Sequence, residues 1–580
     1  MTDGIEIAET LETLIERSEA WIAIDPQDAT RDALRAMVLR ARSSGDTSEL
    51  AECMGDRLRF GTAGLRGTMG PGSNRLNCLM ARQTAFGLAD ALLKHQPAAV
   101  SAGVLVGHDA RHGSEEFAQE IIFVLTQAGV PCTLVPGPQP TPLVAWGLRH
   151  RGFGAAVVVT ASHNPAKDNG IKIYWGDGAQ IVPPVDGWIA EAIESVSSIN
   201  PPGPLMVPTR ADEQLTAEYV DMVVGLVDGP DPQRSDFRIA ATAMHGVGAK
   251  LLRRCLSEAG FTSLSFVPSQ EHPDPDFPTI PFPNPEEAGA TDLLVALATE
   301  TQAEIALATD PDADRLAVAI PDPPSGGFRL LTGDELGALL ATGLLERRAG
   351  EGLLEGSAAS DATAGSARRP LLVTTVVSSQ LLHRIAEAAG TAFEETLTGF
   401  KWLCRPGFEH PEYDQVLAYE ESIGYAVGGL CDKDGIAAAA VVCDLVRSWR
   451  AQGRSCHDVL DGIARQHGAH VTNNFSLRVS GVGWAERLQK LTKELIANPP
   501  KEIAGIAVGR IDQPAADVIR LFLVNGDRVV IRPSGTEPKL KCYCEAVEPI
   551  AANESAQAGV ARAKERAALL RADLTTRLAV

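Results

Sequence analysis

The segment GAAVVVTASHNPAKDNGIKIY, residues 154–174, passes from a run of apolar residues through a polar loop into a second short apolar run. The β-branched run Ala155–Val159 is typical of a buried strand, and Ile171–Tyr174 is strand-like. Pro165 removes a backbone donor and stiffens the loop between them. The pattern therefore predicts that Ser162 lies where a buried strand meets solvent, a position that suits a reacting hydroxyl.

Two other interpretations of Ser162 have to be weighed. A serine in a polar loop is most often part of a local hydrogen-bonded turn. A Ser-His-Asp hydrolase fits poorly, because the chain has no G-x-S-x-G sequence here and His163, the next residue, is badly placed to act as the base for Ser162.

A second site is predicted in EIALATDPDADR, residues 304–315, where a strand leads into three carboxylates at alternate positions: Asp310, Asp312 and Asp314. Three hard oxygen ligands on one short loop suit Mg²⁺. An EF-hand is excluded, because Arg315 and Pro321 stand where that loop needs glycine and glutamate. An acidic turn without an ion is the alternative, but three like charges this close repel strongly without a cation.

Two glycine-containing loops have the composition of phosphate sites. In RFGTAGLRGT, residues 59–68, glycines let backbone amides approach an anion and Arg66 adds a planar donor fork. In RPSGTEPK, residues 532–539, the candidate phosphate ligands are an arginine, two hydroxyls and an opened backbone: Arg532, Ser534, Gly535 and Thr536.

A third candidate site lies in YEESIGY, residues 419–425. Glu420 and Ser422 would stand on one side of an extended loop and offer paired acceptors to hydroxyls. Taken alone, they would be exposed loop acids. In GHDAR, residues 107–111, we expect His108 and Arg111 either to support the site or to make only a local contact with Asp109.

Composition limits the class of protein. The 580 residues are too many for one core, and 45% hydrophobic content with a mean hydropathy near zero suits a soluble globular protein. A net charge of −22 argues against nucleic acid and anionic membranes as partners. Ten cysteines without C-x-x-C, and no basic or apolar signal region at the start, lead us to expect reduced thiols and a cytoplasmic location.

We expect five segments along the chain. They are an N-terminal helical extension of two amphipathic helices (1–55) and domains at 56–205, 206–327, 328–470 and 471–580. A proline-rich linker at 201–208 separates the first two domains, and 350–369 reads as a flexible, small-residue insertion without a catalytic role. Alternating strands and helices indicate mixed α/β layers.

TASHNP, residues 160–165, resembles the phosphoserine loop of the α-D-phosphohexomutase superfamily, and the other loops follow it in that family's order. The strings AKDNGIKIYW and GAQIVPP are most similar to the branch that holds phosphoglucomutase-2 and phosphopentomutase. The resemblance implies three similar mixed α/β domains and a C-terminal α+β domain like the TATA-binding protein, around a central cleft.

The resemblance also implies a role for each candidate residue. Ser162 would carry the phosphoryl group, with Arg66, Lys172 and His163 beside it and proton transfer assigned to Lys172 or His163. The metal ligands would be Ser162, Asp310, Asp312 and Asp314. Arg315, Thr398, Glu420, Ser422 and Lys433 would bind the substrate, and the 532–536 loop would hold the phosphate that is not transferred.

The sequence therefore predicts a phosphosugar mutase, an intramolecular phosphotransferase that interconverts sugar 1-phosphate and 6-phosphate, with glucose favoured. Mg²⁺ and a bisphosphate such as glucose 1,6-bisphosphate would be its cofactor and activator, and a phosphosugar its partner. Mannose or pentose specificity, or a Mg²⁺-dependent sugar-phosphate phosphatase, are the alternatives. A non-catalytic relative would have lost Ser162 or an aspartate, and none is lost.

Overall fold

The computed structural model describes residues 11–61, 64–195, 208–351, 368–479, 484–534 and 539–578. The predicted linker at 201–208 and the predicted insertion at 350–369 lie almost wholly outside these ranges, as do Gly535 and Thr536. The chain divides into two compact units. The first runs up to Gly225 and adds Arg238–Leu316 and Asp434–Ile436; the second holds Leu226–Phe237, Ala317–Lys433 and the rest of the chain.

The described part of the N-terminal extension, residues 11–55, contains three helices, not the two that we predict from the sequence. They are α1 (Leu11–Ile24), α2 (Asp28–Ser44) and α3 (Ser48–Met54). The short α3 has only seven residues, too few for its apolar spacing to register as a periodic pattern. Buried side chains such as Leu14, Trp21 and Leu34 belong to the same hydrophobic core as the strands that follow.

The main sheet of the first unit has seven strands in the order β1-β2-β6-β5-β3-β4-β7. Their bounds are Phe60–Gly61, Gly64–Thr68, Asp168–Trp175, Ala155–Val159, Val104–His108, Cys132–Leu134 and Thr209–Arg210. β5, β3, β4 and β7 are parallel, while β6, β2 and β1 run antiparallel to their neighbours. The predicted strands at 155–159 and 171–174 are therefore the paired strands β5 and β6, and the loop 160–167 joins them.

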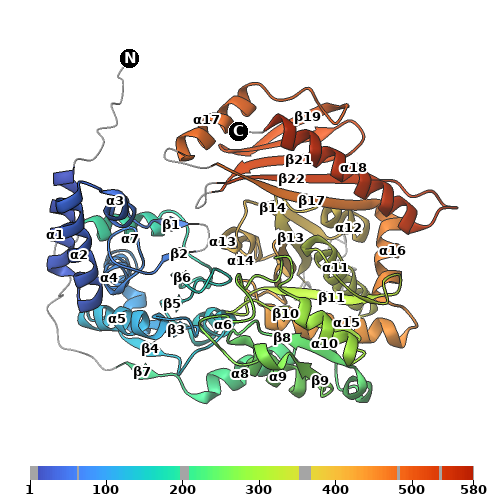
Figure 1. Cartoon of the computed structure of the whole chain (residues 1–580). Coiled ribbons are helices and arrows are strands. Elements are labelled where there is room, and N and C mark those ends of the chain that lie inside the picture. Colours follow the sequence, from blue (N-terminus) through green and yellow to red (C-terminus); the bar gives the residue numbers. More distant parts are fainter. Residues whose placement is uncertain are drawn as a thin grey trace. The chain divides into compact units, whose positions relative to one another are not determined.

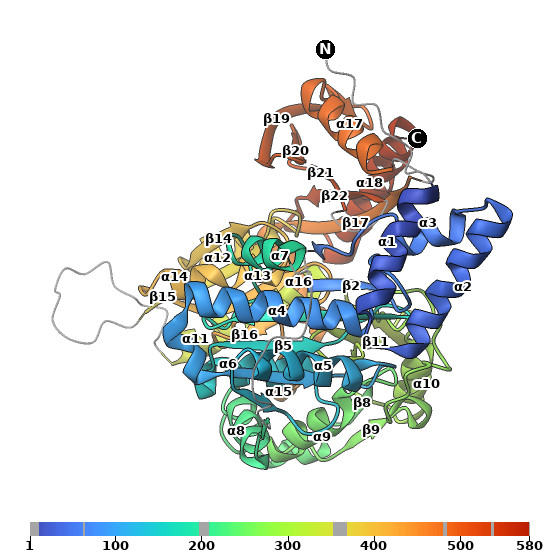
Figure 2. The ribbon, with the colours of Figure 1, turned by 90° about the vertical axis from the view of Figure 1, so that its left-hand side faces the viewer.

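Helices cover both faces of this sheet. They are α4 (Cys78–His95), α5 (Ser114–Gln127), α6 (Thr141–Arg151), α7 (Val185–Ser195) and α8 (Glu213–Val224), with a short 3₁₀ turn at Pro97–Ala102. Figure 1 shows α4 and α5 on one side of the sheet and α6 on the other. Figure 2 shows α4 and α5 lying side by side across it, and both belong to the shared core.

The first unit also contains a parallel group of three strands in the order β10-β8-β9. β8 (Ile239–Thr242), β9 (Leu264–Phe266) and β10 (Ile305–Thr309) alternate with α9 (Gly248–Glu258) and α10 (Asp292–Glu300). A 3₁₀ turn spans Pro268–Gln270. Because parallel strands end at the same edge, the loops after β8 and β10 are brought together there.

The second unit begins with the 3₁₀ turn Pro232–Asp236 and the antiparallel pair β11 (Leu316–Asp322) and β12 (Gly327–Leu330). A four-stranded sheet follows in the order β14-β13-β15-β16, with bounds Ala392–Thr396, Arg369–Thr375, Tyr413–Glu420 and Gly424–Val427. Its helices are α11 (Gly333–Gly350), α12 (Leu381–Ala389), α13 (Phe400–Leu403), α14 (Arg405–Glu409), α15 (Gly435–Ala451) and α16 (Cys456–His467).

The C-terminal part of the second unit is an antiparallel sheet of six strands in the order β17-β22-β21-β20-β19-β18. The strands span Ala469–Arg478, Lys539–Glu548, Arg528–Pro533, Val518–Leu523, Ile506–Ala515 and Glu502–Ile503. Helices α17 (Trp484–Ala497) and α18 (Ala556–Arg577) pack against this sheet through the core that contains Leu488 and Leu570.

All ten cysteines are free, nine of them buried, as we expect for reduced thiols. No helix in the described part of the chain combines the length and the apolar content that are needed to cross a bilayer.

Candidate functional site

Ser162 lies in the loop that joins β5 to β6 and is fully buried. Its Oγ donates a hydrogen bond of 2.7 Å to Asp310 Oδ2, and Nδ1 of His163 lies 3.3 Å from the same Oγ. The structure thus brings together the serine and the acidic loop, which are 148 residues apart in the sequence.

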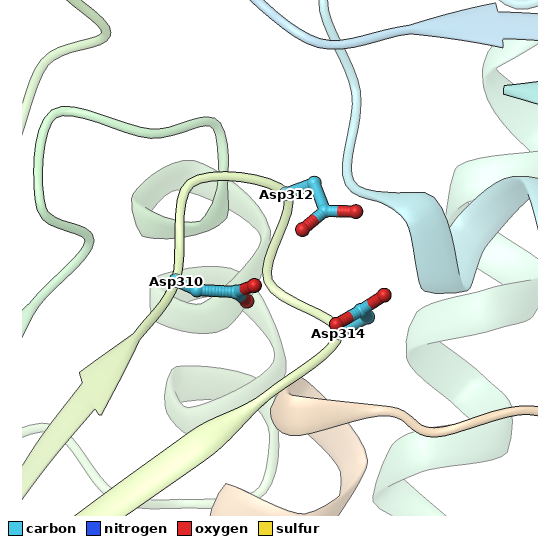
Figure 3. A group of neighbouring side chains, drawn as sticks. All are labelled: Asp310, Asp312 and Asp314. Atoms are coloured by element: carbon cyan, nitrogen blue, oxygen red, sulfur yellow. The ribbon is translucent and has the colours of Figure 1, made fainter. Parts of the chain in front are cut away.

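The acidic loop follows β10 and turns its three carboxylates toward one another (Figure 3). One oxygen from each of Asp310, Asp312 and Asp314 lies within 4.8 Å of the others, and all three residues are fully buried. Asp310 Oδ1 accepts the backbone N–H of Arg315 at 3.0 Å, which closes the loop on itself.

Thr141, at the start of α6, is a site residue that our sequence analysis missed. Its Oγ1 donates to Asp312 Oδ2 at 2.6 Å and its backbone N–H donates to the carbonyl oxygen of Asp312 at 3.0 Å. The two residues are 171 positions apart, so no local spacing signals the contact.

Two glycines allow other loops to pack directly on the acidic loop. A Cβ on Gly246 would lie 2.2 Å from Pro311 Cα, and a Cβ on Gly435 would lie 2.3 Å from the carbonyl oxygen of Arg315. Any side chain at either position would therefore displace the loop that carries the carboxylates.

Lys172 is fully buried on β6 and reaches the acidic loop. Its Nζ lies 2.6 Å from Asp312 Oδ2 and also contacts Asp314 Oδ2. Arg66 lies on β2, opposite Gly170 of β6. Arg66 Nε is buried and has no hydrogen-bond partner among the described residues, so this N–H is available to an anion.

The electrostatics of the site follow from burying charges close together. Burial, and then the carboxylates of Asp312 and Asp314, raise the pKa of Asp310 well above its usual value. Burial and Asp314 also act to raise the pKa of Asp312. Lys172 and Thr141 outweigh them, so the pKa of Asp312 is lowered. Burial, followed by Arg315 and Arg66, lowers the pKa of His163 well below its usual value, so the imidazole is neutral near pH 7.

These residues fit a divalent cation with hard oxygen ligands. The three carboxylates and the Ser162 hydroxyl supply only oxygen donors, and Asp312 Oδ1 is buried without a hydrogen-bond partner in the described residues. The carboxylates face cationic side chains: Lys172 contacts Asp312, and Arg66 and Arg315 act on the loop electrostatically.

In the second unit, two of the predicted sugar-binding residues, Glu420 and Lys433, lie around Gly424. A Cβ there would lie 2.9 Å from the ring of Phe400, 3.0 Å from Cδ of Lys433 and 3.1 Å from Cγ of Glu420. Lys433 Nζ stands 5.6 Å from the centre of the Phe400 ring. Thr398 is partly buried, just before α13.

The predicted extended loop at Glu420 and Ser422 is wrong in its shape. Residues 421–423 form the tight turn of a hairpin between β15 and β16, which pair through Glu420 and Gly424. Glu421, which our sequence analysis did not single out, is bound within this turn: its carboxylate accepts from Ser378 at 3.1 Å and from Ser422 at 3.3 Å. Two consecutive glutamates in the sequence gave no signal of which one is bound in this way.

Arg532, the last residue but one of β21, interacts electrostatically with the acidic residues at this hairpin turn. Burial acts to lower its pKa, but Tyr543, Glu421 and Glu420 outweigh burial and raise the pKa of Arg532. Its guanidinium donates to the Tyr543 hydroxyl at 3.1 Å. Ser534 follows and is buried, while Gly535 and Thr536 lie outside the described residues.

Three of the predicted loops contain a non-glycine residue in the left-handed region of the backbone. These are Ser162 at φ 53°, Ala313 at φ 57° and Ile423 at φ 53°. Such conformations cost about 1–3 kcal/mol each and persist only where the surroundings enforce them. Other such residues, among them Met244 and Gln302, lie outside these loops, so the backbone conformation alone does not mark the site.

The chain matches, in order, four domain models of the phosphoglucomutase/phosphomannomutase family. These are α/β/α domain I at residues 57–200, α/β/α domain II at 217–326, α/β/α domain III at 332–466 and the C-terminal domain at 488–563.

Curated relatives agree with these matches. A probable phosphomannomutase of Haemophilus influenzae is 37% identical over 81% of this chain and 93% of its own length. A probable phosphoribomutase of Schizosaccharomyces pombe is 33% identical, covering 91% of this chain and 93% of itself. The human phosphopentomutase is 31% identical over 92% of both.

Solved structures show the same fold. A putative phosphomannomutase from Thermus thermophilus superposes with a TM-score of 0.68 at 22% identity, over 90% of this chain and all of that one. The parafusin of Paramecium, in its open form, gives a TM-score of 0.64 at 18% identity over 90% of this chain and 96% of its own.

The chain therefore belongs to the phosphoglucomutase/phosphomannomutase family, within the α-D-phosphohexomutase superfamily, and has phosphopentomutase-like relatives. Proteins of this family are phosphomutase enzymes, and the fold class expected from the sequence is confirmed.

Proposed function

We propose that this chain is a phosphosugar mutase that interconverts a sugar 1-phosphate and its 6-phosphate through a phosphorylated Ser162 and a bisphosphorylated sugar. The main support is the 2.7 Å hydrogen bond from Ser162 Oγ to Asp310, because it joins a buried hydroxyl to an oxygen-rich triad on a different loop. We propose glucose as the favoured sugar and mannose as the alternative hexose.

In the first transfer the bond between phosphorus and Ser162 Oγ breaks and a bond to a sugar hydroxyl forms. In the second transfer the other phosphorus–oxygen bond of the bisphosphorylated sugar breaks, the bond to Ser162 Oγ forms again, and the sugar oxygen that is released takes up a proton. The sugar hydroxyl loses its proton and Ser162 Oγ regains one when the enzyme is dephosphorylated. His163 is neutral and its Nδ1 lies 3.3 Å from Oγ, so it is placed to hold a proton on the serine side. Lys172 donates to two carboxylates and supplies fixed positive charge.

We further propose that Ser162, Asp310, Asp312 and Asp314 hold Mg²⁺, whose positive charge, when bound, offsets the charge that develops on the transferring phosphoryl group. Arg66 and Arg315 would contact the phosphoryl oxygens. The buried Nε of Arg66 supports this assignment.

The second unit supplies the proposed substrate ligands. Thr398, Glu420, Ser422 and Lys433 would bind sugar hydroxyls, and Arg532, Ser534, Gly535 and Thr536 the phosphate that is not transferred. The grouping of Glu420 and Lys433 around Gly424 supports the first set. We propose the domain boundaries 56–205, 206–327, 328–470 and 471–580 for these functional parts.

A coupled assay tests the proposal. It follows 6-phosphate formation from glucose 1-phosphate with Mg²⁺ and a trace of glucose 1,6-bisphosphate, and measures free phosphate in parallel. We expect 6-phosphate without free phosphate, a dependence on the bisphosphate, and no activity in Ser162→Ala. Ser101→Ala, which changes an exposed serine of the same unit, is the matched control and should behave as wild type. Release of inorganic phosphate, or full activity in Ser162→Ala, would overturn the phosphoserine mechanism.

The same assay ranks the sugars. Pentose 1-phosphate, with transfer to the 5-position, is a second candidate because two relatives that align over more than nine tenths of this chain are named for ribose and pentose phosphates. Running mannose 1-phosphate and ribose 1-phosphate beside glucose 1-phosphate decides between them by their kcat/KM ratios.

A further inference from the structure

The conformation of the Ser162 loop has to be enforced by its surroundings. Ser162 has a left-handed backbone, which a serine adopts only at a cost. Its backbone N–H donates to Thr160 Oγ1 at 2.9 Å, so the residue two positions earlier already restrains it. The remaining restraint comes from another segment of the first unit.

Arg111, three residues after β3, reaches into this loop with its guanidinium group. It donates to the main-chain oxygens of Ser162 and Asn164, both at 2.6 Å, and of Pro165 at 3.0 Å and Asp168 at 3.3 Å. Only 4% of Arg111 is exposed. Three of the acceptors are carbonyl groups of this loop and the fourth belongs to Asp168, the first residue of β6. The guanidinium group therefore fixes the path of the backbone, including the residue that would carry the phosphoryl group.

Asp109 connects this arginine to the other side of the loop. Its Oδ2 accepts from Thr160 Oγ1 at 2.6 Å and lies 3.3 Å from Arg111 Nε. Its Oδ1 accepts the backbone N–H of Arg111 at 3.0 Å and the hydroxyl of Ser114 at 2.6 Å. The carboxylate therefore restrains Ser162 twice, through Thr160 and through Arg111.

Packing from a third segment completes the enclosure. The ring of Phe277 covers the guanidinium group at 4.9 Å from its centre. An arginine held between a carboxylate, an aromatic ring and four carbonyl oxygens has little freedom to move. The sequence analysis left open whether Arg111 makes only a local contact with Asp109. The structure contains that contact and, in addition, the contacts of Arg111 with the Ser162 loop and with Phe277.

We propose that Arg111 and Asp109 are positioning residues that hold Ser162 in the geometry for phosphoryl transfer while touching neither substrate nor metal. The inference rests on the proposed role of Ser162. A guanidinium group is required because its five N–H donors lie in a fixed plane and reach several acceptors, whereas a lysine ammonium is a single point charge on a flexible stem.

The first test is Arg111→Lys, which keeps the charge and loses the planar fork. We expect kcat to fall about 10²-fold, the size of effect known for small misplacements of reacting groups, while KM for the sugar phosphate stays within about twofold. Arg82→Lys is the matched control, since Arg82 is a partly buried arginine of the same unit that pairs with a carboxylate, Glu120, on α5. It should leave both constants unchanged.

The second test is chemical rescue of Arg111→Ala by added guanidinium ion, measured against the same ion added to Ser162→Ala and to wild type. We expect a saturable recovery of kcat of at least several-fold in Arg111→Ala alone. Asp109→Asn should also lower kcat without changing KM, because it weakens the acceptors of both Thr160 and Arg111.

A readout that does not depend on catalysis separates this inference from the proposed function. Hydrogen exchange of the peptide covering residues 160–170 should speed up in Arg111→Lys while the unfolding temperature stays close to that of wild type. Wild-type kcat in Arg111→Lys, or a loss that merely follows a lower unfolding temperature with no local change in exchange, would overturn the positioning role. Absence of mutase activity in wild type would instead overturn the proposed function and leave the exchange test standing.

Discussion

The two units differ in how they hold the polar groups proposed for function. In the first unit, Ser162, Lys172 and the three aspartates are fully buried and joined by hydrogen bonds. In the second unit, Thr398, Glu420 and Ser422 are partly exposed, although Lys433 is buried. Stabilising a charged transition state needs dipoles and charges that are already in place, whereas a site that binds and releases a sugar tolerates side chains with more freedom.

This comparison predicts that conservative changes at the proposed site residues of the first unit reduce kcat and that those at the proposed site residues of the second unit mainly change KM. Two of the following substitutions test that division and one tests a buried charge outside the site, beginning with the largest expected effect.

Asp312→Asn should reduce kcat/KM by about 10³-fold, because it removes one negative charge from the proposed metal site and from the contact with Lys172 and Thr141. The measurement is steady-state kinetics together with calorimetric titration of Mg²⁺, which should bind more weakly. Removing the metal with a chelator should abolish activity in wild type and restoring Mg²⁺ should recover it. Asp292→Asn, at an exposed position on α10, is the control; equal losses in both variants would contradict the assignment.

Glu545→Gln removes a buried charge of the second unit. We expect this charge to contribute to the free energy of unfolding and to have no part in catalysis. Glu545 accepts from Ser379 at 2.6 Å and His470 at 2.9 Å, and lies 3.0 Å from Arg528. Burial alone would raise its pKa, but Arg528, His470 and Ser379 together lower the pKa of Glu545 to about 2. This corresponds to roughly 3 kcal/mol of stability at neutral pH.

The sign of the pH dependence follows from that lowered pKa. The stabilisation is fully present above the pKa of the unfolded chain, near 4.5, and is lost as the pH falls toward about 2. Urea unfolding at pH 7 should therefore show a deficit of roughly 3 kcal/mol in Glu545→Gln, narrowing between pH 4.5 and 3, with KM unchanged. Glu548→Gln, on the same strand but paired with arginines nearer the surface, should lose at most about 1 kcal/mol. A deficit that stays constant across this pH range would show that the loss has another origin.

Arg532→Lys should give the smallest of these effects. The lysine keeps the charge but cannot bind a phosphate with two parallel hydrogen bonds, so we expect KM to rise about tenfold with kcat changed less. Arg520→Lys is the control, because Arg520 lies on the neighbouring strand and already pairs with Asp512 and Glu395. A fall in kcat without a rise in KM would contradict the proposed division between the units.

Most of the candidate site was accessible from sequence because its residues fall in a few short segments of the chain. Asp310, Asp312 and Asp314 occupy one loop, and Lys172 lies on the strand that follows the Ser162 loop. The family order of the loops then predicted that the serine and the triad meet, which the 2.7 Å hydrogen bond shows.

The contacts that escaped prediction depend on tertiary structure. Thr141 meets Asp312 across 171 residues, and Arg111 reaches carbonyl groups, which leave no trace in side-chain spacing. The turn at Ile423 was missed because a β-branched residue is disfavoured in the left-handed region and so gives no turn signal. The short helix α3 lacked the length for a recognisable period.

The shared core of α1, α2 and the seven-stranded sheet has a consequence for biosynthesis. Leu14 and Trp21 share one hydrophobic core with residues as far along the chain as Ile189 and Ile193. At roughly 5–20 residues per second, synthesis takes on the order of 10 s to pass from these helices to Ile193. The core that contains α1 and α2 is therefore completed well after the helices themselves have been made.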